Sequence, residues 1–311
     1  MATNRCSLLV LLAMAGGVGG ALAPTVSWAG IPTTTGVRLA VQPADESASL
    51  VVSARRDLSA PVATSRVTRD KFVVDVQGLA PETQYYYGLA ADYAAAGGAR
   101  AAEFRTPSAS PRAPFRVAVG ACGWSSGNGA VFANIAELEP RPLVFIHAGD
   151  LHYQDIGEDS LSRFEAAFQG VHAGEAAQLF RTVPLMYTWD DHDFGDNNAM
   201  GSSPSRSAAL AAFRKYVPAT LAGEAGEGVY QSYEVQGVLF IVTGAGHVCA
   251  TKTCVRNAGG RVACGSYQTF ADVHWLQTCA RRATRAPARH WGSGKGSGFS
   301  GCFHGGRSGG L

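Results

Sequence analysis

The sequence lacks a large excess of charge of either sign. Its 26 Lys and Arg residues face 24 Asp and Glu residues, so the formal net charge is +2 over 311 residues. A surface this close to neutrality gives no reason to expect a nucleic acid or an anionic membrane as a partner. Beyond the first 30 residues, the chain also lacks an apolar run long enough to cross a bilayer. These absences leave a globular protein, with room for one large and one small domain.

The amino-terminal segment predicts export. Arg5 gives a positive start, and residues 8–15 form a short apolar run. Small residues then lead to Ser27-Trp28-Ala29, which is similar to a cleavage site before Gly30. A membrane anchor is the alternative, but several glycines and Pro24 interrupt the apolar run. We therefore predict a signal peptide over residues 1–29 and a secreted or periplasmic protein. The segment has no twin arginine, so we expect the general secretory route.

Residues 30–110 predict a small all-β module. Residues 37–41, 48–53 and 71–76 are short apolar or alternating runs separated by turn residues. Residues 79–87 follow a Leu-x-Pro-x-Thr-x-Tyr-x-Tyr pattern. This pattern resembles the corner of fibronectin type III domains, in which a tyrosine hydroxyl bonds back to the backbone. Tyr85 and Tyr87 should share one buried face, and the Pro- and Ser-rich residues 106–114 mark the end of the module.

The next region, residues 111–291, alternates apolar runs with amphipathic stretches. Strands are predicted over residues 115–120, 143–148, 183–189 and 238–243, and helices over residues 128–138, 160–168 and 208–216. Short apolar strands of this kind are typical of a parallel sheet that is covered on both faces. The region is therefore predicted to be an α/β domain.

Polar residues gather where three of these strands end. Cys122 follows the first strand, and Asp150 and Tyr153 follow the second. The third leads into an unusually polar segment, Asp190-Asp191-His192-Asp193 and then Asp196-Asn197-Asn198. Crowded carboxylates repel one another, and a bound cation makes such crowding favourable. A solvated acidic turn is the alternative for the last segment alone. Three consecutive strand ends with candidate ligands favour a metal site at the carboxyl edge of the sheet.

Several neighbouring residues have more ordinary interpretations. Asp190 and Asp193 are expected to cap the loop or to orient other ligands. His147 lies inside an apolar strand and is expected to be a core residue. His152 could point into the cleft, but no pattern in the sequence places it there.

The order of these motifs resembles the alkaline phosphatase D (PhoD-like) family of calcineurin-like metallophosphoesterases, over residues 33–243. The resemblance implies an α-β-β-α sandwich behind the fibronectin-like module. It implies that Cys122, Asp150 and Tyr153 hold iron (Fe³⁺), with Asp150 bridging to a second metal. Asp191 would bind that metal, plausibly calcium, and Asn197 is a weaker candidate. Other divalent metals fit the same ligands.

The resemblance also implies a reaction. The metals would generate a hydroxide that attacks a phosphate monoester or diester. His192 would then lie near the leaving group and orient or protonate it. An equally good interpretation is that His192 only holds Asp191 in place. The expected function is a secreted metal-dependent phosphoric ester hydrolase, an alkaline phosphatase or phosphodiesterase.

The carboxyl-terminal part departs from the family pattern. After residue 243 the only acidic residue is Asp272, and five of the seven cysteines occur there, at positions 249, 254, 264, 279 and 302. We predict a domain truncated or frameshifted after about residue 243, with a Gly/Ser-rich disordered tail over residues 292–311. Two alternatives stay open. One is an inactive fragment that binds metal or a partner through the fibronectin-like module. The other is a late Cys/His module, although its spacing matches no familiar zinc site.

Overall fold

The computed structural model describes residues 24–90, 101–123, 129–220 and 228–242, together with two short strands, β13 (Val255–Arg256) and β14 (Val262–Ala263). These residues all fall within the first of two compact units, Met1–Gln277. The five late cysteines, the predicted disordered tail and the start of the predicted leader lie outside the described residues. Within the described part, no helix is long and apolar enough to cross a membrane.

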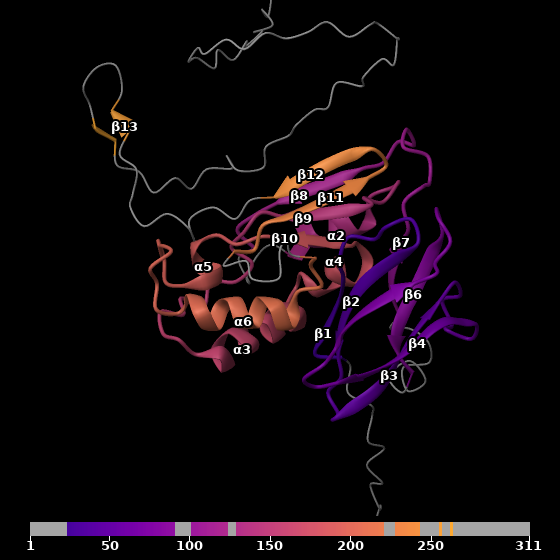
Figure 1. Cartoon of the computed structure of the whole chain (residues 1–311), viewed down its shortest axis with the longest axis horizontal. Helices are drawn as coiled ribbons and strands as arrows, with labels where there is room; N and C mark the ends of the chain where they lie inside the picture. Colours follow the sequence, from indigo (N-terminus) through magenta and orange to yellow (C-terminus); the bar gives the residue numbers. More distant parts are fainter. Residues whose placement is uncertain are drawn as a thin grey trace, which may run out of the picture. The chain divides into compact units, whose positions relative to one another are not determined.

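The amino-terminal module consists of two antiparallel sheets (Figure 1). One sheet has the order β1-β2-β5, formed by Val26–Ala29, Gly36–Gln42 and Val73–Gln77. The other has the order β4-β3-β6-β7, formed by Pro61–Thr68, Ser47–Ser53, Gln84–Leu89 and Ala102–Arg105. The predicted strands correspond to β2, β3 and β5. Strand β4 was not predicted, because it lies at the sheet edge and its mostly exposed, polar residues give no apolar alternation.

The predicted tyrosine corner is confirmed. The Tyr85 hydroxyl accepts a hydrogen bond from the backbone N–H of Ala80 at 2.9 Å. Tyr85 and Tyr87 are both buried on the same face of β6, and the Tyr85 ring stacks on Phe104 with centroids 5.6 Å apart. This closure fixes the turn that leads into β6, because the hydroxyl satisfies a backbone donor that the turn leaves without a strand partner.

Strand β1 changes the interpretation of the predicted leader. Its four residues, Val26–Ala29, are all buried and pair with residues 39–42 of β2. A cleavage after Ala29 would remove this strand from the sheet, so the boundary before Gly30 stays a prediction that the start of the exported chain can test. A leader that ends before Val26 would leave the sheet intact.

The second region contains a parallel sheet with the order β10-β9-β8, formed by Leu185–Tyr187, Val144–His147 and Val117–Gly120. Helices α2 (Gly129–Glu137), α3 (Leu161–Ala173), α4 (Ala177–Thr182), α5 (Asp191–Phe194) and α6 (Arg206–Tyr216) connect or follow these strands. The chain then forms an antiparallel hairpin of β11 (Gln231–Val235) and β12 (Val238–Val242). The predicted α/β alternation is confirmed.

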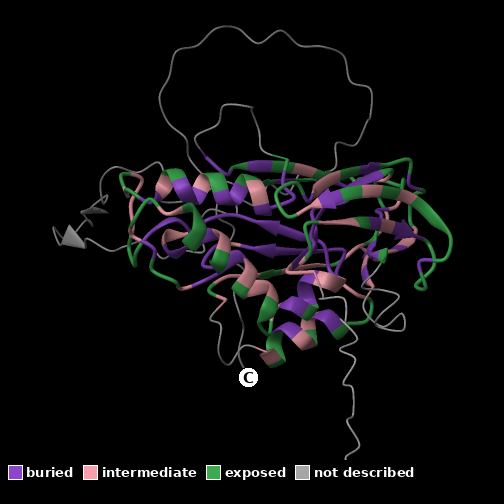
Figure 2. Cartoon of the chain, turned by 90° about the horizontal axis from the view of Figure 1, so that it is seen from below, coloured by how far each residue is buried: buried purple, intermediate pink, exposed green. Residues whose placement is uncertain are grey.

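The two faces of the parallel sheet pack against different layers. Phe145 and Tyr187 face the main core, which the helices cover. Ile146 and Met186 face a second core, which Phe240 of β12 closes. Figure 2 shows the central strands buried, whereas each helix carries both buried and exposed residues. The described residues thus form helix, sheet and sheet layers of the predicted α-β-β-α sandwich.

The outer face of the hairpin is partly apolar and uncovered. Leu239 and Ile241 are 43% and 36% exposed on β12, while Phe240 and Val242 point inward and are buried. The alternation is that of a strand with one covered face. It agrees with the prediction of a sandwich whose outermost layer is incomplete among the described residues.

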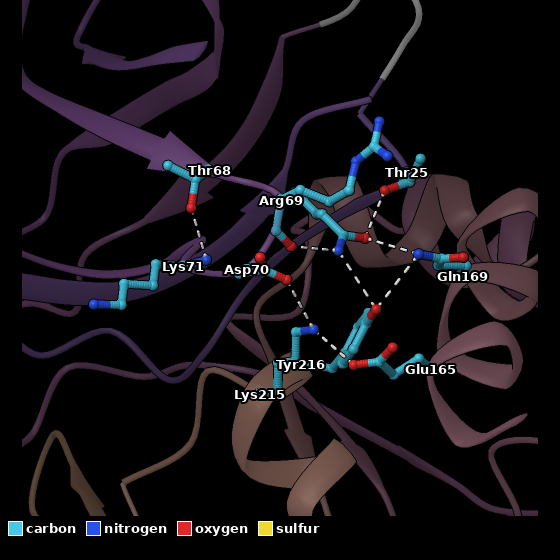
Figure 3. Close-up of polar contacts among 10 residues, drawn as sticks. Thr25, Thr68, Arg69, Asp70, Lys71, Glu165, Gln169, Lys215 and Tyr216 are labelled. Atoms are coloured by element: carbon cyan, nitrogen blue, oxygen red, sulfur yellow. Dashed lines mark hydrogen bonds and ion pairs between the residues drawn. The ribbon is translucent and has the colours of Figure 1, made fainter. Parts of the chain in front are cut away.

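The β-module packs directly on helices α3 and α4 and on Tyr216 at the end of α6. Trp28 of β1 is fully buried, and its indole N–H donates to the backbone oxygen of Tyr216 at 2.8 Å. Figure 3 shows the polar part of this contact. There Gln42 bonds to Gln169 and to the Tyr216 hydroxyl, and Lys215 pairs with Glu165 at 2.6 Å and with Asp70 at 3.4 Å. The two regions therefore share one core and one polar network.

Buried histidines make the fold sensitive to acid. His147 is buried as predicted, and burial lowers its pKa to about 4. Burial, and secondly the charge of Arg181, lower the pKa of His172 to about 3. Both groups bind protons more tightly in the unfolded chain, whose histidine pKa is about 6.5. Their contribution to stability is therefore complete above about pH 6.5 and is lost as the pH falls toward the folded-state values.

We expect the free energy of unfolding to fall less between pH 7 and pH 5 in His172→Phe than in the original chain, by about 2 kcal/mol. The histidine ring already packs edge-on against Trp28 at 4.7 Å, and a phenyl ring takes up no proton. The raised pKa values of the buried carboxyl groups Asp190 and Asp193 act in the opposite direction in both proteins, so the comparison isolates His172. Urea denaturation at the two pH values would measure it, and an equal change in both proteins would contradict the assignment.

Candidate metal centre

The ends of β8, β9 and β10 meet at one edge of the parallel sheet. The register pairs His147 with Gly120 on one side and with Tyr187 on the other, so the residues that follow these positions emerge together. The backbone N–H groups of Cys122 and Gly123 donate to the oxygens of Gly149 and Asp150 at 3.0 and 2.8 Å. The first two strand ends are therefore fastened to each other beyond the sheet itself.

The turn after β9 has an uncommon backbone conformation. Gly149 has φ +107°, and a side chain there would lie 2.6 Å from Cβ and the backbone nitrogen of Asp190. Only glycine therefore allows the second and third strand ends to approach this closely. Cys122 and Asp150 also have positive φ, 57° and 56°. Left-handed residues other than glycine often occur where a site fixes the direction of a side chain.

A single buried carboxylate holds the second and third strand ends together. Asp193, 2% exposed, accepts hydrogen bonds from the backbone N–H groups of Asp150, Leu151 and Asp190 at 2.6, 2.7 and 2.8 Å. Asp190 accepts from the N–H of Asp191 at 2.9 Å and caps α5. The predicted capping roles of Asp190 and Asp193 are confirmed.

Asp193→Ala is expected to lower the free energy of unfolding by about 2–4 kcal/mol, because it leaves three buried N–H groups without an acceptor. The loss is smaller than the sum of three lost hydrogen bonds. Burial raises the pKa of Asp193 to about 8, which shows that its charged form is unfavourable there, and the substitution removes that unfavourable burial as well. Asp190→Ala is the matched control and should cost about 1 kcal/mol, the usual value of a helix cap. Urea denaturation at pH 7 would compare them, and equal losses would contradict the role of Asp193.

Around Asp150, four of the predicted ligands come together. The Tyr153 hydroxyl donates to Oδ2 of Asp150 at 3.0 Å, and Sγ of Cys122 lies 3.5 Å from the same oxygen. Asp150, Asp191 and His192 each offer one ligand atom, and these atoms lie within 4.8 Å of one another. Asp150 thus belongs to both groups, as a bridging ligand would.

The chemistry of these donors fits a cation. Asp150 is fully buried, and its Oδ1 has no hydrogen-bond partner among the described residues. An ionised buried oxygen in this state is unfavourable unless a cation binds it. The donors also differ as two metals would require, with thiol and phenol on one side of Asp150 and carboxylate and imidazole on the other.

The pKa shifts at the centre also favour a bound cation. Burial raises the pKa of Asp150, and the nearby Asp191 raises it further. Burial likewise raises the pKa of the Cys122 thiol and of the Tyr153 phenol, and it raises the pKa of Asp190 to about 6. The negative forms of these groups are therefore disfavoured by themselves. A bound cation reverses this, because it stabilises each deprotonated ligand.

His192 has a partner that the sequence did not reveal. Its Nδ1 lies 2.7 Å from Oδ1 of Asp155, and its ring lies 4.3 Å from the ring of Tyr153. Asp155 stands in a loop without a recognisable motif, so no signal in the sequence could have identified it. It orients the imidazole in the way that carboxylates commonly orient catalytic or ligating histidines.

Asn197 is not brought into the cluster in the way the other predicted ligands are. It is exposed in the turn after α5, and the residue that contacts the site is Asn198, whose backbone N–H donates to Asp191. Asn198 has φ 62°, which reverses the chain toward Asp191. The role of Asn197 in metal binding stays a prediction.

One solved structure shares the described architecture over most of this chain. The structure of PhoD aligns with a TM-score of 0.58 and 17% sequence identity, over 72% of this chain and 52% of PhoD. The chain therefore spans about half the length of that structure. The similarity shows a PhoD-like metallophosphoesterase fold.

Other comparisons give weaker matches. A purple acid phosphatase from yellow lupin (Lupinus luteus) seeds aligns with a TM-score of 0.49 and 12% identity, over 71% of this chain and 44% of its own. The central fibronectin-III array of RIM-binding protein covers 32% of this chain with a TM-score of 0.24 and 25% identity, over 33% of its own chain. No family model and no curated protein sequence matches.

Proposed function

We propose that this chain is a metal-dependent phosphoric ester hydrolase that acts on phosphate monoesters or diesters after export to the periplasm or the medium. The observation that carries the proposal is the convergence of Cys122, Asp150, Tyr153, Asp191 and His192 at the carboxyl edge of a sheet with a PhoD-like fold. Clefts at this edge are where open α/β sheets place their ligands.

In this proposal, Cys122, Asp150 and Tyr153 would hold iron, and Asp150, Asp191 and His192 would be the ligands available to a second metal such as calcium. Bound metals would supply charge neutralisation on the phosphate and activation of water. The chain itself contributes orientation. Asp193 fixes the backbone of Asp150 and Asp190, and Gly149 lets the two strand ends lie close together.

His192 would orient or protonate the oxygen of the leaving alcohol. Asp155 accepts from Nδ1 of His192, which leaves Nε2 to hold or transfer a proton. General acid catalysis of this type contributes roughly 100- to 10,000-fold. If His192 instead serves only to hold the second metal, Asp155 would still set its orientation.

A second candidate is an inactive fragment that binds metal or a partner through the β-module. The observation that favours it is coverage, because the chain spans only 52% of PhoD. Metal binding alone cannot distinguish the two proposals, whereas turnover can.

The test is hydrolysis of p-nitrophenyl phosphate and bis-p-nitrophenyl phosphate by the purified chain, loaded with iron and calcium or stripped with a chelator. We expect release of p-nitrophenolate only with metal, and a fall of about 10- to 100-fold in Asp155→Asn, as for other residues that orient ligands. Bound metal and an intact fold without turnover of either ester would support the inactive fragment.

A further inference from the structure

A cavity of about 320 Å³ lies beside the candidate metal centre. It shares Tyr153 and Gly123 with that centre, and Tyr153 is the residue whose hydroxyl bonds to Asp150. Its other walls come from α2, α3, α4 and the loop after β9. Apolar side chains form most of these walls, among them Phe132, Leu151, Ile156, Ala167, Val171 and Phe180. Gln154, Arg163 and Glu175 also line the cavity, so one positive and one negative side chain border it.

One wall carries a polar group without a partner. His152 is 4% exposed, and neither of its ring nitrogens has a hydrogen-bond partner among the described residues. His147 also lines the cavity, and its Nδ1 is in the same state. An unsatisfied buried polar group costs about 1–3 kcal/mol, so its retention in an apolar wall needs an explanation. A ligand with one hydrogen-bonding atom provides it.

Small residues on α3 create the space. Ala166 and Ala167 stand four and three positions before Gly170, and all three line the cavity. A side-chain carbon built on Gly170 would have nothing within 4 Å. A glycine in the middle of a helix costs roughly 0.5–1 kcal/mol relative to alanine. Helix packing does not require glycine here, and a small residue at this position keeps the cavity open.

We propose that this cavity binds the alcohol portion of the ester, and that the preferred alcohol is a neutral aromatic one with one or two rings. The inference rests on the proposed phosphoesterase function. The volume of about 320 Å³ lies at the lower end of the range for small-molecule sites, about 300–1,000 Å³, and suits an alcohol of one or two rings. The apolar walls suit a ring, and His152 suits a single polar atom on it.

The position matches the reaction. Hydrolysis forms a bond between the oxygen of water and phosphorus, breaks the bond from phosphorus to the alcohol oxygen, and gives that oxygen a proton. Because Tyr153 both lines the cavity and bonds to Asp150, an ester bound at the centre would release its alcohol beside this cavity. Ring burial there would contribute to substrate binding at roughly 25 cal/mol per Å² of apolar surface removed from water.

Gly170→Leu tests the proposal, with Gly170→Ala as the matched control. Side chains on a helix lean toward its amino terminus, so leucine at 170 would cover Ala166 and Ala167 and fill the cavity. Alanine adds one methyl group and should leave the space open. Two measurements are needed on the full chain: fluorescence titration with 1-naphthol, and hydrolysis of 1-naphthyl phosphate beside methyl phosphate.

We expect Gly170→Leu to weaken 1-naphthol binding at least 10-fold and to raise KM for 1-naphthyl phosphate by a similar factor. The kcat/KM for methyl phosphate should stay within about 2-fold, because a methyl group does not reach the cavity. Equal naphthol binding in all three proteins, or no binding in any, overturns the assignment. If naphthol binds as expected but neither ester is hydrolysed, the phosphoesterase function fails and the cavity loses its role as a leaving-group site.

Discussion

Asp150→Asn is expected to reduce hydrolysis of p-nitrophenyl phosphate by about 1,000-fold or more, which corresponds to about 4 kcal/mol of transition-state stabilisation. The carboxylate contacts Tyr153 and Cys122 on one side and shares the cluster of Asp191 and His192 on the other. Its other oxygen is buried without a partner among the described residues. An amide of the same shape has lost the charge that binds a cation.

The fold should survive this substitution. Asp150 is held through its backbone N–H, which donates to Asp193, and asparagine keeps that donor. Burial also raises the pKa of Asp150, so a neutral group at this position does not lower stability in the absence of metal. We therefore expect unchanged circular dichroism, an unfolding midpoint at least equal to that of the original chain, and loss of bound metal.

Asp57→Asn provides the control. Asp57 lies between β3 and β4, is half-exposed and bonds to Ser59, away from the strand ends that form the centre. Activity should be unchanged there. If Asp150→Asn retained more than about a tenth of the activity together with its metal, the bridging role of Asp150 would be excluded.

A chain that begins at Gly30 is expected to fail to fold, whereas a chain that begins at Pro24 should fold. The difference is β1, whose residues pair with β2 and are buried. Trp28 should contribute much of the stability that β1 provides, because its ring contacts Phe168, His172, Phe180 and Tyr187. Loss of the strand also exposes the surfaces of α3 and α4 that pack against it.

Trp28→Ala in the chain that begins at Pro24 measures the contribution of the Trp28 side chain separately from that of the backbone pairing of β1. Truncation of a buried tryptophan costs about 3–5 kcal/mol, and the Tyr216 carbonyl loses its donor as well. Val62→Ala on β4 is the control, since Val62 is 51% exposed and its loss should cost less than about 0.5 kcal/mol.

Thermal unfolding and soluble yield would measure these variants, and sequencing the amino terminus of exported protein would locate the leader boundary. We expect the exported chain to start before Val26. A stable protein that starts at Gly30 would show that β1 is dispensable and would restore the boundary predicted from the sequence.

The sequence predicted most of the elements and the position of the candidate site. Apolar runs of six or seven residues predicted the strands of the parallel sheet, and the residues soon after them are the candidate site residues Cys122, Asp150, Tyr153, Asp191 and His192, which the structure brings together. This works because side chains at the carboxyl ends of neighbouring parallel strands meet by topology, whatever lies between them. The tyrosine corner was predictable for a similar reason, since donor and acceptor are five residues apart.

Only the tertiary structure decided the partners. The bond from His192 to Asp155 joins residues 37 positions apart, and the bonds from Asp150 and Leu151 to Asp193 span 43 and 42. The cavity is likewise formed by three helices and a loop. The sequence assigned the residues of β1 to the end of a leader, whereas in the structure they pair with β2, because buried strands and leader sequences are both short and apolar. Local patterns record which residues avoid water, whereas packing decides which of them meet.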